Sequence, residues 1–105
     1  MKKTELFEEH GFKDLTFSNY LVHESEHMKV INFNFKAGQK LPVHSHDLDG
    51  ELNLAILEGE GEFLAADGAT MPAKTGDVLV TEIREPHGVR AITDMRVLVT
   101  IAPPI

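Results

Sequence analysis

The stretch from Gly38 to Gly59, GQKLPVHSHDLDGELNLAILEG, decides the fold of this chain and contains its most informative side chains. His44 and His46 are separated by a single residue, and side chains on a β-strand alternate between two faces. Both imidazoles are therefore expected to point the same way, and two imidazoles on one face of a stiff strand can bind one divalent metal ion. The apolar run Leu52–Leu57 predicts a central, buried strand that ends at a glycine-rich turn.

Turn residues divide the rest of the chain into short segments, spaced by about ten residues, as in all-β sandwiches and barrels. Met28–Phe35 alternates between two faces in the manner of a half-buried strand. Asp67-Gly68 lies between two extended segments and indicates a hairpin. Further strands are predicted over Leu15–His23, Lys40–His46, Glu51–Leu57, Phe63–Ala65, Met71–Ala73, Val78–Ile83, His87–Ile92 and Arg96–Ala102. The pattern predicts an all-β sandwich or barrel.

The N-terminal segment does not share this period of two. Residues 4 to 12 favour a short helix, with Thr4 as the N-cap and Gly11 as the stop, and the alternative is a loosely ordered arm. At 105 residues the chain is expected to form one domain, residues 1–105. We assign 1–14 to the arm or short helix and 15–105 to the barrel.

Composition excludes several classes of function. The net charge of −7 and the scattered lysines and arginines argue against a nucleic-acid surface, which needs a basic patch. There are no cysteines, so any metal must be held by histidine and carboxylate side chains. No apolar run approaches the roughly 18 residues that span a bilayer, and no apolar segment follows the first lysines as in a signal peptide. The sequence predicts a cytoplasmic protein without a membrane partner.

The spacing around the histidines resembles the first sequence motif of the cupin superfamily. That motif reads Gly, five residues, His-x-His, three or four residues, Glu, six residues, Gly. Gly38 precedes His44-Ser45-His46 by five residues, and Glu51 follows after four. The closing glycine, Gly59, arrives after seven residues instead of six.

The second cupin motif reads Gly, five residues, Pro, one, Gly, two, His, three, Asn. Gly76 opens it and His87 falls at the required offset. Three turn and packing positions depart from the pattern, namely Glu82 for Pro, Arg84 for Gly and Ala91 for Asn. The resemblance covers roughly residues 33 to 101.

The resemblance implies a double-stranded β-helix, or jelly roll, in which His44, His46, Glu51 and His87 converge on one divalent metal ion. The extra residue after Glu51 bears on this ligand set, since a slip of one residue turns side chains to the opposite face. The loop 47–50 or a bulge would have to absorb it. Otherwise Glu51 points outward, and the fourth ligand is Asp47, Asp49 or water.

Three imidazoles and a carboxylate suit Fe, Mn, Zn, Ni or Cu and leave coordination positions open for a substrate. The resemblance therefore implies a small metal-dependent enzyme, of the dioxygenase, isomerase or decarboxylase type, acting on a small organic molecule. One alternative is a sensor or binding module of the same fold that binds a metal or small ligand without turnover. Another is a metal-free structural dimer. Small cupins commonly pair, so a homodimer is expected in each case.

Other polar side chains lack such context. The remaining histidines, His10, His23 and His27, are interpreted as surface residues. Arg84 and Arg90 flank His87 in sequence and either meet an anionic substrate or are ordinary surface charges, which we favour.

Overall fold

The computed structural model describes residues 1–105 and consists almost entirely of short strands. The elements in chain order are α1 (Leu6–Glu9), β1 (Ser18–Glu24), β2 (Lys29–Phe35), β3 (Lys40–His44), β4 (Glu51–Glu58), β5 (Glu60–Leu64), a 3₁₀ turn (Ala66–Gly68), β6 (Thr70–Lys74), β7 (Val78–Glu82), β8 (His87–Ala91) and β9 (Met95–Ala102). No helix is long and apolar enough to cross a membrane.

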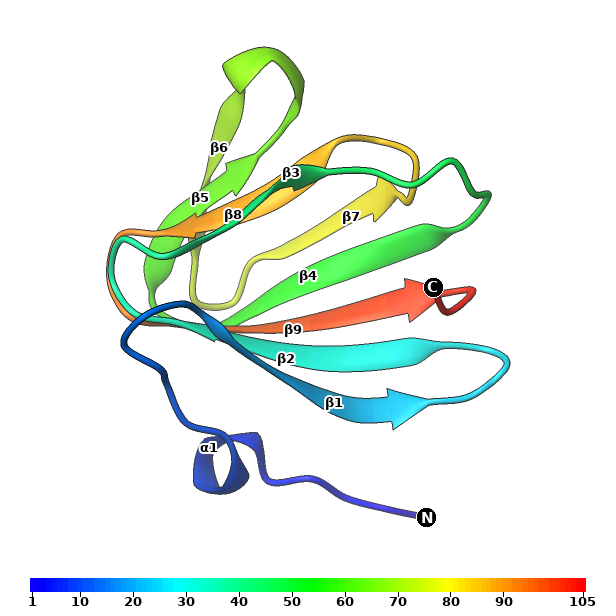
Figure 1. The fold of residues 1–105 in the computed structure, drawn as a ribbon, viewed down its shortest axis with the longest axis horizontal. Coiled ribbons are helices and arrows are strands. Elements are labelled where there is room, and N and C mark those ends of the chain that lie inside the picture. The colour runs from blue at the N-terminus through cyan, green and yellow to red at the C-terminus, as the bar shows by residue number, and fades with distance from the viewer.

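The strands form two sheets that face each other (Figure 1). One sheet has the order β1-β2-β9-β4-β7 and the other has the order β3-β8-β5-β6, with every pairing antiparallel. Between β2 and β9, every connection except the β5–β6 hairpin passes from one sheet to the other. This is the double-stranded β-helix that the sequence predicts, so the predicted fold is confirmed.

Alternation along the central strands places the core between the sheets. In β9, Val97, Val99 and Ile101 are buried, while the residues between them face outward and are half-buried. The buried apolar residues form one cluster, made of Phe33, Phe35, Leu52, Leu54, Ile56, Phe63, Ala73, Ile83, Val89, Ala91, Met95, Val97, Val99 and Ile101. Burial of these side chains is the main force that closes the two sheets on each other.

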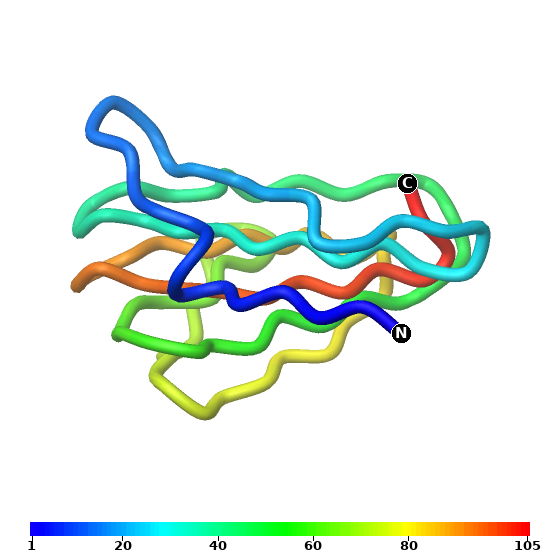
Figure 2. Tube along the Cα trace, turned by 90° about the horizontal axis from the view of Figure 1, so that it is seen from below, coloured from blue at the N-terminus to red at the C-terminus, as the bar shows by residue number.

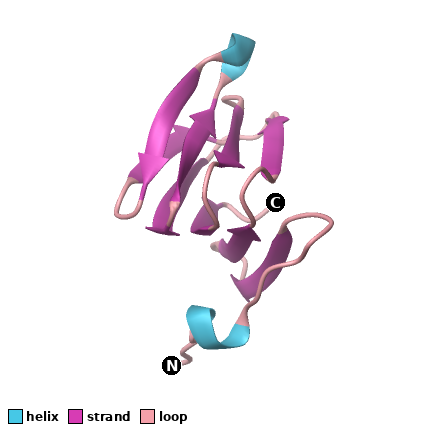
Figure 3. Cartoon of the chain, turned by 90° about the vertical axis from the view of Figure 1, so that its left-hand side faces the viewer, coloured by secondary structure: helices cyan, strands magenta, loops and turns pink.

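The hairpin predicted at Asp67-Gly68 joins β5 to β6. Asp67 and Gly68 have φ values of 59° and 76°, and a tight hairpin turn requires such left-handed conformations. Figure 3 shows this hairpin projecting at the end of the molecule opposite the N-terminal helix.

The N-terminal segment forms an ordered arm with a helix of only four residues, Leu6–Glu9, shorter than the predicted 4–12. The arm runs across the outer face of the five-stranded sheet (Figure 2). The amide of Asn34 donates to the Gly11 carbonyl at 2.9 Å, and Arg96 donates to the His10 carbonyl at 2.9 Å. His10, interpreted from the sequence as a surface residue, is half-buried and stacks on Tyr20. The arm therefore covers polar side chains on the outer face of the five-stranded sheet that would otherwise be exposed to solvent.

Candidate metal centre

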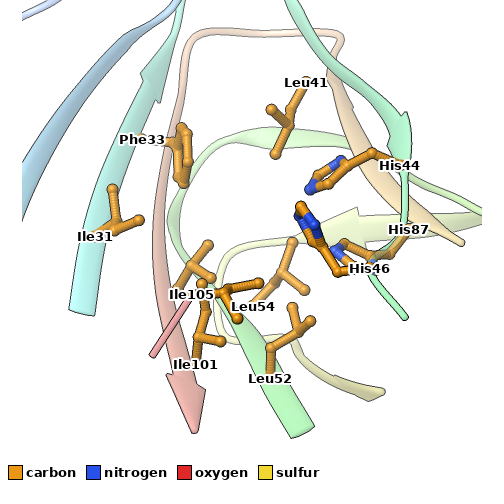
Figure 4. A pocket seen from close by; sticks show the side chains of 11 residues that line it. Ile31, Phe33, Leu41, His44, His46, Leu52, Leu54, His87, Ile101 and Ile105 are labelled. Atoms are coloured by element: carbon orange, nitrogen blue, oxygen red, sulfur yellow. The ribbon is translucent and has the colours of Figure 1, made fainter. Parts of the chain in front are cut away.

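Three histidines gather at one end of the space between the sheets. His44 ends β3 and is the direct antiparallel partner of His87, which begins β8. The ring centres of His44 and His87 are 4.5 Å apart, and those of His44 and His46 are 5.7 Å apart. Figure 4 shows the three imidazoles on one side of a hollow whose opposite side is apolar. The structure thus brings together the three histidines that the sequence singled out.

His46 reaches this position from a loop, because β3 ends at His44 and not at His46 as predicted. The pairing of β3 with β8 is irregular between Leu41 and His44, and the chain then leaves the sheet. The backbone N–H of His46 bonds to the carbonyl of Ile83 at 3.2 Å, and the N–H of Ile83 bonds to the carbonyl of Gly50 at 3.0 Å. These bonds fix the loop beside the start of β4.

Backbone carbonyls orient two of the imidazoles. Nδ1 of His44 lies 2.9 Å from the Pro42 carbonyl oxygen, and Nδ1 of His87 lies 2.7 Å from that of Glu85. A carbonyl can only accept, so Nδ1 carries the proton in each neutral ring and Nε2 keeps its lone pair. Metal-binding histidines characteristically donate their second ring N–H in this way. The two rings are therefore in the tautomer that coordinates through Nε2.

His87 is the buried member of the cluster, and only 5% of this residue is exposed to solvent. Burial lowers the pKa of His87 below its ordinary value of 6.5, and the nearby His44 and His46 lower it further. The hydrogen bond to the Glu85 carbonyl acts in the opposite direction and does not cancel these effects. His87 is thus held in its neutral form near pH 7, which is the form that binds metal.

The histidines open onto a cavity of about 220 Å³ between the sheets. Its lining consists of Ile31, Phe33, Leu41, His44, His46, Leu52, Leu54, His87, Val99, Ile101 and Ile105. Eight of these eleven residues are apolar, and the histidines supply all of the polar side chains. Nothing in the sequence pattern indicated that Leu41, Ile101 and Ile105 would line the cavity. Ile105 joins the lining because the chain folds back after β9, where Lys29 Nζ donates to the Ile105 carbonyl at 3.0 Å.

Glu51 does not join the histidines. In β4 the residues Leu52, Leu54 and Ile56 are buried, so Glu51 falls on the outward face and is exposed. Counted back from Gly59, the six-residue spacing of the motif ends at Leu52, which lines the cavity. The additional residue therefore lies between His46 and Leu52. The register shift between Ile56 and Glu58 comes later in β4 and leaves the inward alternation of Leu52, Leu54 and Ile56 unchanged. Counting from the closing glycine would have identified Leu52.

The alternative carboxylates also lie outside the cavity. Asp47 and Asp49 are fully exposed, and Arg84 bonds to Asp49 at 2.7 Å and lies 4.0 Å from Asp47. Arg90 pairs with Glu62. Both arginines are therefore engaged with carboxylates rather than directed at the cavity, as the surface-charge interpretation expected.

The donor set fits a divalent transition metal, although the side chains are not in a ligating arrangement. No group of three or more His, Cys, Asp or Glu side chains stands at metal-holding geometry. Two imidazoles bound at about 2.0–2.1 Å place their ring centres roughly 5 Å apart. The observed separations for the two pairs that include His44, 4.5 and 5.7 Å, lie on either side of that value. Neutral imidazoles with free Nε2 atoms suit Zn, Fe, Cu and Ni.

Comparison with known families places this site in context. Residues 32–101 match the model of the cupin domain, about two-thirds of the chain, and the chain therefore belongs to the cupin family. A comparison with curated proteins finds no match.

Solved structures share the whole fold. An RmlC-like cupin protein from Desulfovibrio desulfuricans is 60% identical, with a TM-score of 0.97, and the match covers 100% of this chain and 99% of that one. A conserved protein with a double-stranded β-helix domain from Klebsiella pneumoniae is 19% identical, with a TM-score of 0.89 over 98% of this chain and 90% of that one. Ectoine synthase from P. lautus is 21% identical, with a TM-score of 0.77 over 100% of this chain and 80% of that one.

Proposed function

We propose that this cupin holds one divalent metal ion through His44, His46 and His87, and that it is a small metal-dependent enzyme acting on a small organic molecule. The observation that supports the proposal is the convergence of three imidazoles at the mouth of a cavity, with His44 and His87 oriented by backbone carbonyls. Glu51 is left out of the ligand set because it lies on the outer face.

The histidines, the backbone carbonyls and the apolar walls of the cavity would have separate roles. The three histidines would supply neutral nitrogen donors, and the carbonyls of Pro42 and Glu85 would hold two of the rings in register. The apolar walls would exclude water and position the organic part of a substrate. A bound metal of this kind supplies Lewis-acid or redox chemistry at a substrate oxygen. Oxygenation, isomerisation and decarboxylation all use that chemistry, and the identity of the metal decides among them.

One observation favours the rival proposal, a binding module of the same fold. The cavity contains no carboxylate and no hydroxyl for proton transfer, so only the imidazoles are available as acids or bases. Such a lining binds a ligand well and equips the protein poorly for reactions that need a separate general base. Fold does not separate the two proposals, although ectoine synthase shows that an enzyme is built on this barrel.

The decisive experiment is elemental analysis of protein purified without a histidine tag. We expect about one metal per chain in the natural protein and none in the double variant His44→Ala, His46→Ala. The double variant His23→Ala, His27→Ala is the matched control, because these histidines lie outside the cavity and should leave the metal content unchanged. Absence of metal from the natural protein, even after reconstitution, would refute the proposal.

A homodimer belongs to the same proposal. Exposed apolar side chains collect at the free edges of the two sheets, with Met71 on β6 at 56% exposure and Val78 and Val80 on β7 at 61% and 63%. A second copy of the chain that covered these edges would bury this apolar surface and protect the unpaired strands. Light scattering should then give twice the mass of one chain. The double variant Val78→Lys, Val80→Lys should reduce the measured mass to that of a single chain. A monomeric natural protein at micromolar concentration would contradict the dimer.

A further inference from the structure

We infer that Ile105, which follows β9, sets the greatest length of apolar ligand that the cavity accepts, and that Lys29 holds Ile105 in place. Ile105 thus determines specificity, and Lys29 acts through it as a positioning residue. The inference rests on the proposed function in so far as the ligand is a substrate, but it concerns only the wall of the cavity. The observation that carries it is that Ile105 lines the cavity and is tied to the sheet by one hydrogen bond, from Lys29 Nζ to the Ile105 carbonyl oxygen at 3.0 Å.

Ile105 is the apolar lining residue with the fewest restraints. Of the eight apolar residues in the lining, the other seven belong to β2, β3, β4 and β9, whereas Ile105 lies outside every strand. It is half-buried, while Leu54 and Val99 deeper in the cavity are 1% and 5% exposed. Figure 4 shows Ile105 on the apolar side of the hollow, across from the histidines. A ligand that contacts the histidines and extends across the hollow therefore meets Ile105.

A close backbone contact fixes the base of the segment that carries Ile105. Pro103 and Pro104 have no backbone N–H, so the pairing of β9 with its neighbours ends before them. Gly50 has a φ of 142°, and a Cβ atom added there would lie 2.5 Å from Cδ of Pro103. Only glycine permits this approach, so Pro103 packs closely against the loop between β3 and β4. The segment is thus anchored at Pro103, whereas its far end depends on Lys29.

Lys29 is placed to hold that far end. It begins β2 two residues before Ile31, which lines the cavity, so the two side chains leave the strand on the same face. The Lys29 side chain is 25% exposed, and its nearest carboxylate, that of Glu24, lies 4.0 Å away. The Ile105 carbonyl oxygen at 3.0 Å is therefore the closer partner of the ammonium group. A hydrogen bond from a charged donor is stronger than one from a neutral donor, yet one substitution removes it.

The test measures how affinity depends on ligand length. The probes are straight-chain primary alcohols from 1-butanol to 1-octanol, whose hydroxyl group can donate to the free Nε2 of His44. They are titrated into the full-length protein, and two-dimensional NMR spectra follow the amide signals of Leu54 and Val99, which report binding in the cavity. Each buried methylene should raise the affinity about fourfold until the probe reaches Ile105, after which further methylenes should add nothing.

Ile105→Ala removes three carbon atoms from the wall, so its affinities should keep rising for at least one further methylene. The longest probes should then bind this variant at least about fourfold more tightly than the natural protein. Ile92→Ala is the matched control, because it makes the same change at a residue that is 58% exposed and outside the lining. It should stop at the same probe length as the natural protein. Equal stopping lengths in the natural protein and Ile105→Ala would overturn the inference, as would failure of both to bind any probe.

Lys29 is tested with a pair of variants. Lys29→Met removes the donor and keeps the aliphatic stem, so it should extend the stopping length as Ile105→Ala does. Lys29→Arg keeps a charged donor and should restore the natural stopping length. If Lys29→Met kept the natural stopping length, the positioning role would be refuted.

Elemental analysis of the same samples separates this inference from the proposed metal centre. The stopping length depends on the wall alone, so it should be the same before and after treatment with EDTA. A protein that never binds metal would refute the proposed function and leave the length limit standing. An unchanged stopping length in Ile105→Ala would refute the length limit whatever the metal content.

Discussion

Gly88 offers the sharpest test of how the barrel positions its histidines. It follows His87 in β8 and faces the backbone of β3, the strand that ends at His44. A Cβ atom added at Gly88 would lie 2.6 Å from the Leu41 carbonyl oxygen and 3.0 Å from the Val43 backbone nitrogen. Both neighbours belong to the backbone and have no side-chain freedom with which to give way. Gly88→Ala must therefore separate β3 from β8.

The size of the displacement follows from the contact distances. Ordinary van der Waals contact begins at 3.4 Å, so the carbonyl oxygen must move by about 0.8 Å relative to β8. Ligand geometry has to be kept within about 0.5 Å for full function. We therefore expect Gly88→Ala to weaken metal binding by about 10- to 100-fold, with a loss of folding stability of about 1–3 kcal/mol from overpacking.

Competition with a chromogenic chelator measures the metal affinity, and urea denaturation of the metal-free protein measures the stability. Gly11→Ala is the matched control, because a Cβ at Gly11 meets no atom within 4 Å. It should change neither quantity appreciably. A Gly88→Ala protein with unchanged metal affinity would refute the reasoning that the β3–β8 spacing sets the relation of His44 to His87.

Three further predictions address other parts of the molecule. Glu51→Ala should leave the metal content of the protein unchanged, because this side chain lies on the outer face; loss of metal in elemental analysis would return Glu51 to the ligand set. Because burial lowers the pKa of His87, the unfolded chain binds a proton just below pH 6.5 that the folded, metal-free protein does not. Its stability should be full above that pH and fall as the pH drops through it, and thermal melts at pH 7.5 and 5.5 should show a smaller fall for His87→Gln. Val97→Ala should cost about 2 kcal/mol, at about 0.8 kcal/mol per buried methylene plus a cavity term, because Val97 is 1% exposed. Leu15→Ala, at 100% exposure and away from the strand edges proposed for the dimer, should stay within about 0.5 kcal/mol in the same urea titration, and equal losses would show that burial in this core is misassigned.

The sequence predicted the strands well where burial enforces a period of two. The expected strand at Arg96–Ala102 forms as Met95–Ala102, and that at Val78–Ile83 forms as Val78–Glu82. Each of these strands has a face toward the core, so the pattern of apolar residues reflects a physical requirement. The N-terminal helix is shorter than predicted, because the arm is held by hydrogen bonds to Asn34 and Arg96 rather than by its own helical propensity.

The site was predictable in its histidines and not in its carboxylate. His44 and His87 are direct partners in the antiparallel pairing of β3 with β8, so the two strands fix their positions relative to each other. Glu51 follows a loop, and a loop can absorb one residue at almost no cost, so its length does not fix the face on which the next strand begins. The strand is instead anchored at its far end, where Gly59 has a φ of 99° and packs against the Asp94 backbone. The residues from the C-terminal segment, such as Ile105, were not predictable because their position depends on tertiary contacts alone.

The position of Ile105 has a practical consequence for handling the protein. This residue lines the cavity and is tied to Lys29, so any polypeptide fused after it would begin at the rim of the candidate site. An affinity tag there would place its own histidines within reach of the natural ones and would alter the wall against which a ligand packs. The first residues of the chain lie on the outer side of the five-stranded sheet, away from β3 and β8, the strands that carry His44 and His87 (Figure 1). A cleavable tag at the N-terminus is therefore the design that keeps metal analysis and ligand titration interpretable.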